Sequence, residues 1–267
     1  MSQVASTPLK AHEVRQRART GEFDGTTAGL AMGCMQANLV ILPKALAWDF
    51  LLFCQRNPRP CPVLEVLDSG SWEPRETAPG ADLRTDLPRY RVFEHGTLVD
   101  EPRDIRRWWR DDLVSFLLGC SFSFEQAMQR GGLPLRHIEE NKTVSMYRTS
   151  IRCKPAGPFE SPLVVSMRPL TPMQAAKAAA ITARYPLAHG APVHIGDPAA
   201  IGVHALDQPD YGEAVTIRSG ELPVFWACAV TPQAAIGHAR PPLAITHAPG
   251  RMFVTDIPAD SGVQETV

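Results

Sequence analysis

Short apolar runs alternate with segments of helical spacing along the chain. The run Leu39–Leu42 is continuously apolar and Leu113–Leu118 is apolar except for Ser115, which is typical of strands that are buried on both faces. An amphipathic segment follows each run, over Lys44–Arg56 and from Phe124 onward. This alternation predicts an α/β protein in which helices flank mixed, largely buried sheets.

The later part of the chain shows the same alternation. A strand over Leu163–Met167 precedes a helix over Pro172–Arg184, which Thr171 caps while Gln174 completes a capping box. A first helix is expected from about Thr7 to Thr20, before the glycine-rich turn Gly25–Gly33. The remaining predictions are a helix near Asp104–Arg110, a helix over Pro232–Ala239, and strands near Val63–Val66, Tyr90–Phe93, Pro192–Ile195, Ala214–Arg218 and Val224–Trp226.

Several short patterns occur twice in the same order. "GCSFSFEQAM" (Gly119–Met128) and "ACAVTPQAAI" (Ala227–Ile236) share the pattern C-x-x-[ST]-x-[EQ]-x-A. D-x-P-x-Y and M-[YF]-x-T-x-I also occur twice, and the offset falls from 126 residues (Pro43 to Pro169) to 106 (Met146 to Met252). We interpret this as an internal duplication of one α/β unit. Chance recurrence of common turn residues is the alternative.

The duplication divides the chain into three parts. Residues 1–36 form an N-terminal helix and a glycine-rich turn, residues 37–155 the first α/β half, and residues 156–267 the second. The length of 267 residues is ample for a buried core, and 44% apolar with 21% charged residues is typical of a globular protein.

The net charge, the first residues and the length of the apolar runs limit which kinds of partner are expected. The net charge of −1 gives no reason to expect nucleic acid, and acids interrupt the basic cluster Arg103–Asp112. The first residues lack the apolar region of a secretory signal, and no apolar run is long enough to span a membrane. We therefore predict a cytoplasmic protein without a membrane partner.

The six cysteines form no C-x-x-C pair and have no metal-ligand spacing with histidines. We expect reduced thiols, no bound metal and no cofactor. In the repeated pattern, Ser123 and Thr231 fall where a helix N-cap is expected, just after Cys120 and Cys228. A helix N-terminus can lower a thiol pKa or bind a carboxylate. Ordinary packing of small residues is the alternative reading.

Other candidates for chemistry lie near the repeated patterns. Glu125 in the first pattern corresponds to Gln233 in the second, so one half could have specialised. Arg148 and Arg168 could bind a carboxylate through two nitrogens, or form purely structural ion pairs. Further candidates for proton transfer or binding are His189, His194, Asp197 and His247.

Much of the chain resembles the D-glutamate cyclase family. The stretches that carry the resemblance include "TTAGLAMGCMQANLVILP", "GCSFSFEQAM", "VVSMRPL", "PVFWACAVTPQAAI" and "ITHAPGRMFVTDI", and it extends from about Val14 to Ile257. It implies an α/β architecture and lyase chemistry that eliminates water, since characterised relatives convert D-glutamate to 5-oxo-D-proline. Ala229 and Ser145 depart from the glycine and proline expected there, and no catalytic residue is carried over.

Cyclisation of glutamate sets three tasks for a site. It must bind the α-carboxylate, deprotonate the ammonium group and protonate the leaving oxygen, or else form a thioester on a cysteine. We expect Cys120, Ser123, Cys228 and Thr231 to line one pocket. The catalytic candidates are Cys120, Glu125, His189, His194, Cys228 and His247, and the binding candidates are Ser123, Arg148, Arg168, Thr231 and Asp197.

The expected partner is a small carboxylate substrate, and a homo-oligomer is compatible with the sequence. Two other functions stay open: dehydration of another small hydroxy acid, and non-catalytic binding of a carboxylate.

Overall fold

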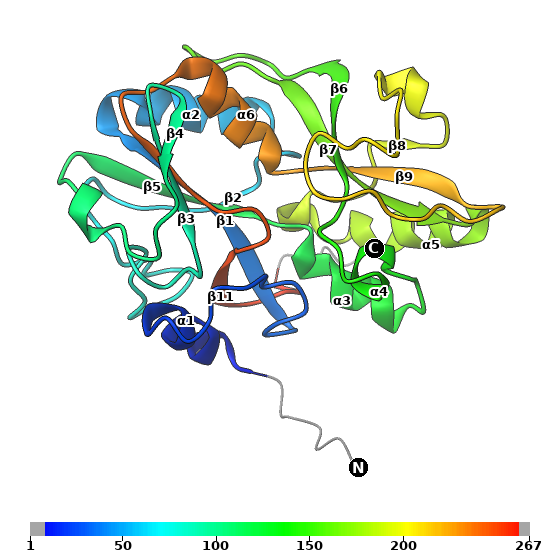
Figure 1. Cartoon of the computed structure of the whole chain (residues 1–267), viewed down its shortest axis with the longest axis horizontal. Coiled ribbons are helices and arrows are strands. Elements are labelled where there is room, and N and C mark those ends of the chain that lie inside the picture. The colour runs from blue at the N-terminus through cyan, green and yellow to red at the C-terminus, as the bar shows by residue number, and fades with distance from the viewer. Residues whose placement is uncertain (1–8, 262–267) are drawn as a thin grey trace.

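Two antiparallel sheets organise the chain in a computed structural model that describes residues 9–261 (Figure 1). The first sheet is built around β1 (Cys34–Pro43), which pairs with β5 (Leu113–Gly119) from Ala37↔Gly119 to Pro43↔Leu113. Its strand order is β2-β5-β1-β10-β3-β4, and β11 also pairs with β1. The other strands are β2 (Val63–Val66), β3 (Tyr90–Glu94), β4 (Thr97–Asp100), β10 (Ala244–His247) and β11 (Phe253–Pro258).

The second sheet has the order β6-β7-β9-β8. Its central strands are β7 (Pro162–Leu170) and β9 (Leu222–Ala227), and β6 (Met146–Arg152) and β8 (His194–Ile195) lie at its edges. The helices are α1 (Ala11–Arg19), α2 (Lys44–Arg56), α3 (Phe122–Arg130), α4 (Arg136–Glu139), α5 (Pro172–Ala183) and α6 (Val230–Ala239), with short 3₁₀ turns at Arg106–Trp108, Pro186–Ala188 and Pro198–Ile201. The predicted α/β class is confirmed.

Every strand pairing within residues 9–261 is antiparallel, where mixed sheets were expected. The helices that follow β5 and β9 do not return to their own sheet. Phe124 and Met128 of α3 pack with Ala175 of α5 against the second sheet. A parallel pair needs a crossover that returns to the same sheet, so these helices create none.

The two related halves exchange their last elements. β11 pairs with β1, and β6 pairs with β7. The strand orders β5-β1-β11 and β9-β7-β6 therefore match, as a duplicated unit requires. Likewise, Ala235 and Ile236 of α6 pack in one cluster with Phe50 and Phe53 of α2. The division at residue 155 follows the repeat along the chain, whereas each sheet draws on residues from both sides of it.

Local capping rules account for α5. The Thr171 hydroxyl accepts from Gln174 N, and the Gln174 side chain accepts from Thr171 N at 3.0 Å, which is the predicted capping box. The first helix extends over Ala11–Arg19, and the predicted start at Thr7 lies outside the described residues. The helix predicted near Asp104–Arg110 is a single 3₁₀ turn, Arg106–Trp108.

The strand predicted over 214–218 does not form. Thr216 N donates to the Glu140 carboxylate at 3.2 Å, and Thr216 O accepts from Arg136 Nη1 at 2.6 Å. Side chains thus satisfy the backbone groups that a neighbouring strand would otherwise pair.

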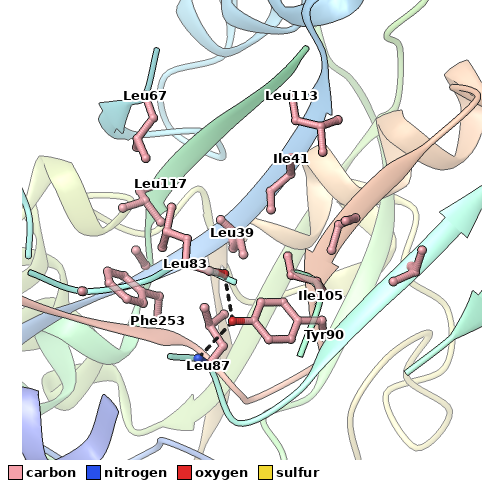
Figure 2. Close-up of a cluster of buried hydrophobic side chains, with 14 of the residues drawn as sticks. Leu39, Ile41, Leu67, Leu83, Leu87, Tyr90, Ile105, Leu113, Leu117 and Phe253 are labelled. Atoms are coloured by element: carbon pink, nitrogen blue, oxygen red, sulfur yellow. Dashed lines mark hydrogen bonds between the residues drawn. The ribbon is translucent and has the colours of Figure 1, made fainter. Parts of the chain in front are cut away.

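Apolar side chains cover both faces of the first sheet. Figure 2 shows one face, where Leu39, Ile41 and Leu117 meet residues of the long segment between β2 and β5. Tyr90 lies within this cluster, and its hydroxyl donates to Leu83 O at 2.8 Å and accepts from Leu87 N at 3.3 Å (Figure 2). Burial on both faces explains why most residues of β1 and β5 are apolar.

Candidate functional site

The first turns of α3 and α6 are anchored in the same way. Ser123 Oγ accepts from Gln36 N at 3.1 Å, and Thr231 Oγ1 accepts from Val164 N at 2.9 Å. The prediction that Ser123 and Thr231 are N-caps is wrong, because α3 begins at Phe122 and α6 at Val230. Each hydroxyl instead pairs a buried strand amide of its own half, which would otherwise lack a partner.

A buried ion pair lies at the start of α3. Glu125 Oε1 is 2.5 Å from Arg168 Nη2, and the two side chains are 5% and 1% exposed. Arg168 also donates to Ser121 Oγ and Ser166 Oγ, both at 3.2 Å. Its guanidinium carbon lies 5.3 Å from the Phe124 ring centre and 5.4 Å from that of Trp226. These contacts fix the cation, because stacking and hydrogen bonding both restrict the planar group.

His137 of α4 completes this cluster. His137 Nε2 lies 3.2 Å from the same Glu125 oxygen, although it does not meet hydrogen-bonding geometry. Burial alone raises the pKa of Glu125, but Arg168 and His137 outweigh that effect and hold the pKa below its ordinary value. Glu125 is therefore an ionised carboxylate at neutral pH.

A cavity of about 240 Å³ opens beside Glu125. Its wall is formed by the glycine-rich turn from Gly29 to Cys34, by Gln36 and by one face of α3. Both contacts of Glu125 fall on Oε1, so Oε2 has no hydrogen-bond partner among residues 9–261. Gln36 Nε2 donates to Thr27 O at 2.9 Å and Leu30 O at 3.2 Å, which turns its Oε1 away from these carbonyls.

Unpartnered buried polar atoms gather at this place. Within the described part of the chain, four buried side-chain polar atoms lack a hydrogen-bond partner. Three of them, Gln36 Oε1, His137 Nε2 and Arg168 Nε, belong to the cavity wall or to residues that contact Glu125. Gln36 lines the cavity, and His137 and Arg168 contact Glu125, which also lines it. Such atoms are costly to bury, so their concentration around Glu125 indicates a site for a polar ligand.

The glycine-rich turn has an unusual backbone. Gly29, Ala31 and Gly33 have φ of +75°, +44° and +100°, and Ala31 is held in the left-handed region despite its side chain. The N–H groups of Gly29, Ala31 and Gly33 have no acceptor among residues 9–261. Free N–H groups in a turn of this kind are suited to bind an anion, although Leu30 N between them donates to Thr27 O at 3.0 Å.

Of the two cysteines of the repeated pattern, Cys120 is buried and Cys228 is half-buried. Burial raises the pKa of Cys120 to about 12, and Cys228 adds to the effect, which makes the two thiols neighbours. Burial likewise raises the pKa of Cys228 to about 11. Of the two readings left open for these cysteines, ordinary packing is favoured, because loss of hydration exceeds the effect of the helix N-termini.

The predicted histidines do not join this cluster. His189 Nδ1 donates to Arg59 O at 2.7 Å, and His247 Nδ1 accepts from Leu39 N at 3.2 Å. Burial lowers the pKa of each imidazole to about 4, so both are neutral at physiological pH. His194 Nε2 lies 2.6 Å from Asp197 O, and the Asp197 side chain accepts from Ala199 N at the start of a 3₁₀ turn.

The predicted binding residues do not all lie at one site. Arg168 and Glu125 meet, whereas Arg148 is exposed and donates to the Tyr211 hydroxyl at 2.6 Å. Ser123 lines the 240 Å³ cavity, but Cys120, Cys228 and Thr231 do not, so the four residues expected to share one pocket do not all line this cavity. Thr231 is fully buried.

The sequence patterns did not indicate His137 or Gln36. His137 belongs to no repeated pattern, and it reaches Glu125 only because α4 follows a turn after α3. The segment Gly25–Gly33 was noticed as glycine-rich, and its unusual spacing was the available signal for a ligand-binding turn.

Residues 9–261 contain neither a cluster of metal ligands nor a membrane-spanning helix. No group of three or more histidine, cysteine or acidic side chains there is arranged to hold a metal ion. No helix in that range has the length and apolarity to cross a membrane.

Comparison with known proteins finds one matching family profile and several similar proteins. The profile of the D-glutamate cyclase family matches residues 114–256. Proteins named "Putative hydro-lyase" are similar along nearly the whole chain. The one from Stutzerimonas stutzeri is 57% identical over 96% of this chain and 97% of its own. The one from Rubrobacter xylanophilus is 61% identical over 92% and 95%.

A third relative of the same name, from Natranaerobius thermophilus, is 59% identical over 91% of this chain and 94% of its own. Identity of this extent supports assignment to the lyases that eliminate water. With the family profile covering α3, α6 and the ion pair between Glu125 and Arg168, the chain belongs to the D-glutamate cyclase family.

Proposed function

We propose that this protein cyclises D-glutamate to 5-oxo-D-proline with loss of water, in the cavity beside Glu125. The observation that carries the proposal is the set of unpartnered polar atoms, Gln36 Oε1, His137 Nε2 and Arg168 Nε, around an ionised, buried carboxylate. The cavity of about 240 Å³ has room for one small amino acid and little more.

The wall offers complementary groups for both ends of an amino acid. Glu125 Oε2 and Gln36 Oε1 are acceptors for the ammonium group. The side-chain amides of Gln126 and Gln129, together with the free N–H groups of the turn Gly29–Gly33, are donors for carboxylates.

The reaction itself needs two proton transfers and no nucleotide. The substrate carries one ammonium and two carboxylates. The nitrogen loses two protons, the C–N bond forms at the carbon of the γ-carboxyl group, and a C–O bond of that carboxyl group breaks. The departing oxygen takes both protons and leaves as water, so atoms and charge balance.

Glu125 is suited to move these protons one at a time. As a carboxylate it accepts the first proton from the ammonium group, which frees the nitrogen lone pair for attack on the carbon of the γ-carboxyl group. It then delivers a proton to the γ-carboxyl oxygen and repeats the transfer as the C–O bond breaks. Arg168 and His137 act as positioning residues, because both contact Oε1 and hold Oε2 toward the cavity.

The test is an assay of the purified full chain with D-glutamate and without ATP. We expect 5-oxoproline, detected by a mass lower by one water, and no product from L-glutamate. Glu125→Gln keeps the side-chain shape but cannot accept a proton, and we expect turnover to fall about 10²–10⁴-fold. Glu139→Gln is the matched control, since Glu139 pairs with Arg136 and does not line the cavity.

Other outcomes decide between functions. Dehydration of small hydroxy acids, with D-glutamate left unchanged, would replace the cyclase by another hydro-lyase. Binding of carboxylates without any turnover would indicate a binding protein. Full activity of Glu125→Gln would remove Glu125 from the proton-transfer step.

A further inference from the structure

The repeat relates the cavity beside Glu125 to a second cavity on α6. Phe122, Glu125, Gln126 and Gln129 line the first, and residues 108 positions later line the second. These are Val230, Gln233, Ala234 and Gly237. Residues at the beginning of the corresponding strands β1 and β7 also line the cavities. They are Cys34 and Gln36 in the first cavity and Glu160 and Pro162 in the second. The duplication has therefore produced two related cavities with different walls.

The second cavity has lost the carboxylate and gained positive charge. Gln233 stands where Glu125 stands in the first cavity, and an amide cannot accept a proton at neutral pH. Four arginines, Arg91, Arg148, Arg152 and Arg240, line the wall, and the volume is about 780 Å³.

Two of these arginines are not neutralised. Arg91 pairs with Glu101 at 2.5 Å, and Arg152 lies 3.5 Å from Glu160. Arg148 and Arg240 form no ion pair with a carboxylate among residues 9–261. The Asp210 carboxylate also contacts Arg148, but it accepts from the backbone amide, at 2.8 Å, and not from the guanidinium group. Two guanidinium groups thus remain free to bind an anion.

The two unpaired arginines, Arg148 and Arg240, have different surroundings. Arg148 Nε and Nη2 donate to the Tyr211 hydroxyl at 3.1 Å and 2.6 Å, so the phenolic hydrogen is free to donate elsewhere. Arg240 ends α6 in the left-handed conformation, with φ of +47°, where the chain turns away from the helix. Guanidinium groups bind carboxylate and phosphate oxygens through two parallel hydrogen bonds.

We propose that this cavity is a non-catalytic binding site for a small dianion, either a dicarboxylate or a phosphate monoester, which Arg148 and Arg240 hold. The inference goes beyond the proposed cyclisation, since it concerns the other half of the chain and no bond is made or broken. The charge of the ligand follows from the two unpaired guanidinium groups, and the absence of chemistry follows from Gln233.

Calorimetric titration of the full chain at low salt tests the site. The probes are glutarate and inorganic phosphate, which separate the two sources of a dianion by their relative affinity. We expect at least one probe to bind with one-site stoichiometry. Arg148→Gln and Arg240→Gln should each weaken it about 10-fold or more, because each removes a charge-assisted contact. Arg184→Gln, which removes an exposed charge outside this cavity, is the matched control.

The outcomes are distinct from those of the cyclase assay. Binding that survives Glu125→Gln but not Arg148→Gln supports the second site, whether or not D-glutamate is turned over. Failure of both probes to bind would overturn it. So would an equal loss of affinity in Arg184→Gln, which would indicate attraction by overall charge alone, or a loss caused only by Glu125→Gln.

Discussion

Glu125 Oε1 lies 2.5 Å from Arg168 Nη2, and this contact joins a helix that follows the first sheet to the central strand of the second. Both side chains are almost fully excluded from water. A buried pair of this kind adds little net stability, but removal of one partner is costly because the other charge is left alone. The pair therefore sets the ionisation of Glu125 more than it stabilises the fold.

Arg168→Lys should change the pH dependence of turnover. The variant keeps the positive charge but loses the planar group that contacts Glu125, Ser121 and Ser166. Weaker stabilisation of the carboxylate raises the pKa of Glu125, so we expect the acidic limb of kcat/KM to move to higher pH. We also expect a loss of about 1–3 kcal/mol in the free energy of unfolding.

Arg136→Lys is the control for this substitution. Arg136 is also 1% exposed, and it pairs with Glu221 at 2.7 Å outside the cavity beside Glu125. It should lower stability to a similar degree and leave the pH profile where it was. An unmoved profile in Arg168→Lys would contradict the role assigned to Arg168.

The cysteines should prove dispensable for turnover. Burial raises the pKa of Cys120 to about 12 and of Cys228 to about 11, so neither is a thiolate at pH 8. Cys120→Ala and Cys228→Ala should retain most of the wild-type kcat, and neither thiol should react with a disulfide reagent until the protein is unfolded. A covalent adduct between substrate and either thiol, seen by mass spectrometry, would restore the thioester mechanism.

Stability should fall between pH 6.5 and pH 4. Burial lowers the pKa of His189 and His247 to about 4, while in the unfolded chain it is about 6.5. The unfolded state therefore binds more protons in this range, and stability is lost as the pH falls. At pH 5 each histidine should have lost about 2 kcal/mol of its contribution, measured by urea unfolding.

Two variants isolate this effect. His189→Gln and His247→Gln should each flatten the dependence of the unfolding free energy on pH between 7 and 5. His12→Gln, at an exposed position of α1, should not. Parallel curves for the wild type and both buried variants would mean that these histidines are not the groups that titrate.

Two glycine-to-alanine substitutions should change the free energy of unfolding in opposite directions. A Cβ on Gly119 would lie 1.7 Å from Leu187 O, a backbone atom that cannot move alone, so Gly119→Ala should cost more than about 3 kcal/mol. Gly237 lies inside α6 with nothing within 4 Å of its Cβ position. Gly237→Ala should stabilise by about 0.5–1 kcal/mol, and chemical denaturation measures both. A stable Gly119→Ala would contradict the close approach of these segments.

The fold was predictable where local chemistry decides it. The helices over Lys44–Arg56 and Pro172–Ala183, the strand over Val63–Val66 and the Thr171 capping box all depend on neighbours along the chain. The duplication was visible because two copies of one unit keep similar residues at similar burial. Burial on both faces made β1 and β5 recognisable as apolar runs.

The candidate site was predicted only in part. Glu125 and Arg168 were singled out by residue type and position, but nothing along the chain places them in contact. His137 and Gln36 gave no signal, since a histidine or glutamine looks the same whether it faces solvent or a buried charge. The sequence left open whether Cys120 is an activated thiol or only packs in the core, because a helix N-terminus is visible in a sequence and loss of hydration is not.

The sequence by itself determined the helices α1, α2, α3, α5 and α6, the strands β1, β5, β7 and β9, and the repetition, because these follow from periodicity, capping and turn chemistry over a few residues. Only the tertiary structure decided which sheet each helix covers. α3 and α6 each pack on the sheet of the other half. Likewise, β6 and β11 each pair with a strand of the other half. That exchange brings Glu125 against Arg168 and separates Arg148 from both, since contacts between residues far apart in the chain depend on how apolar faces pack.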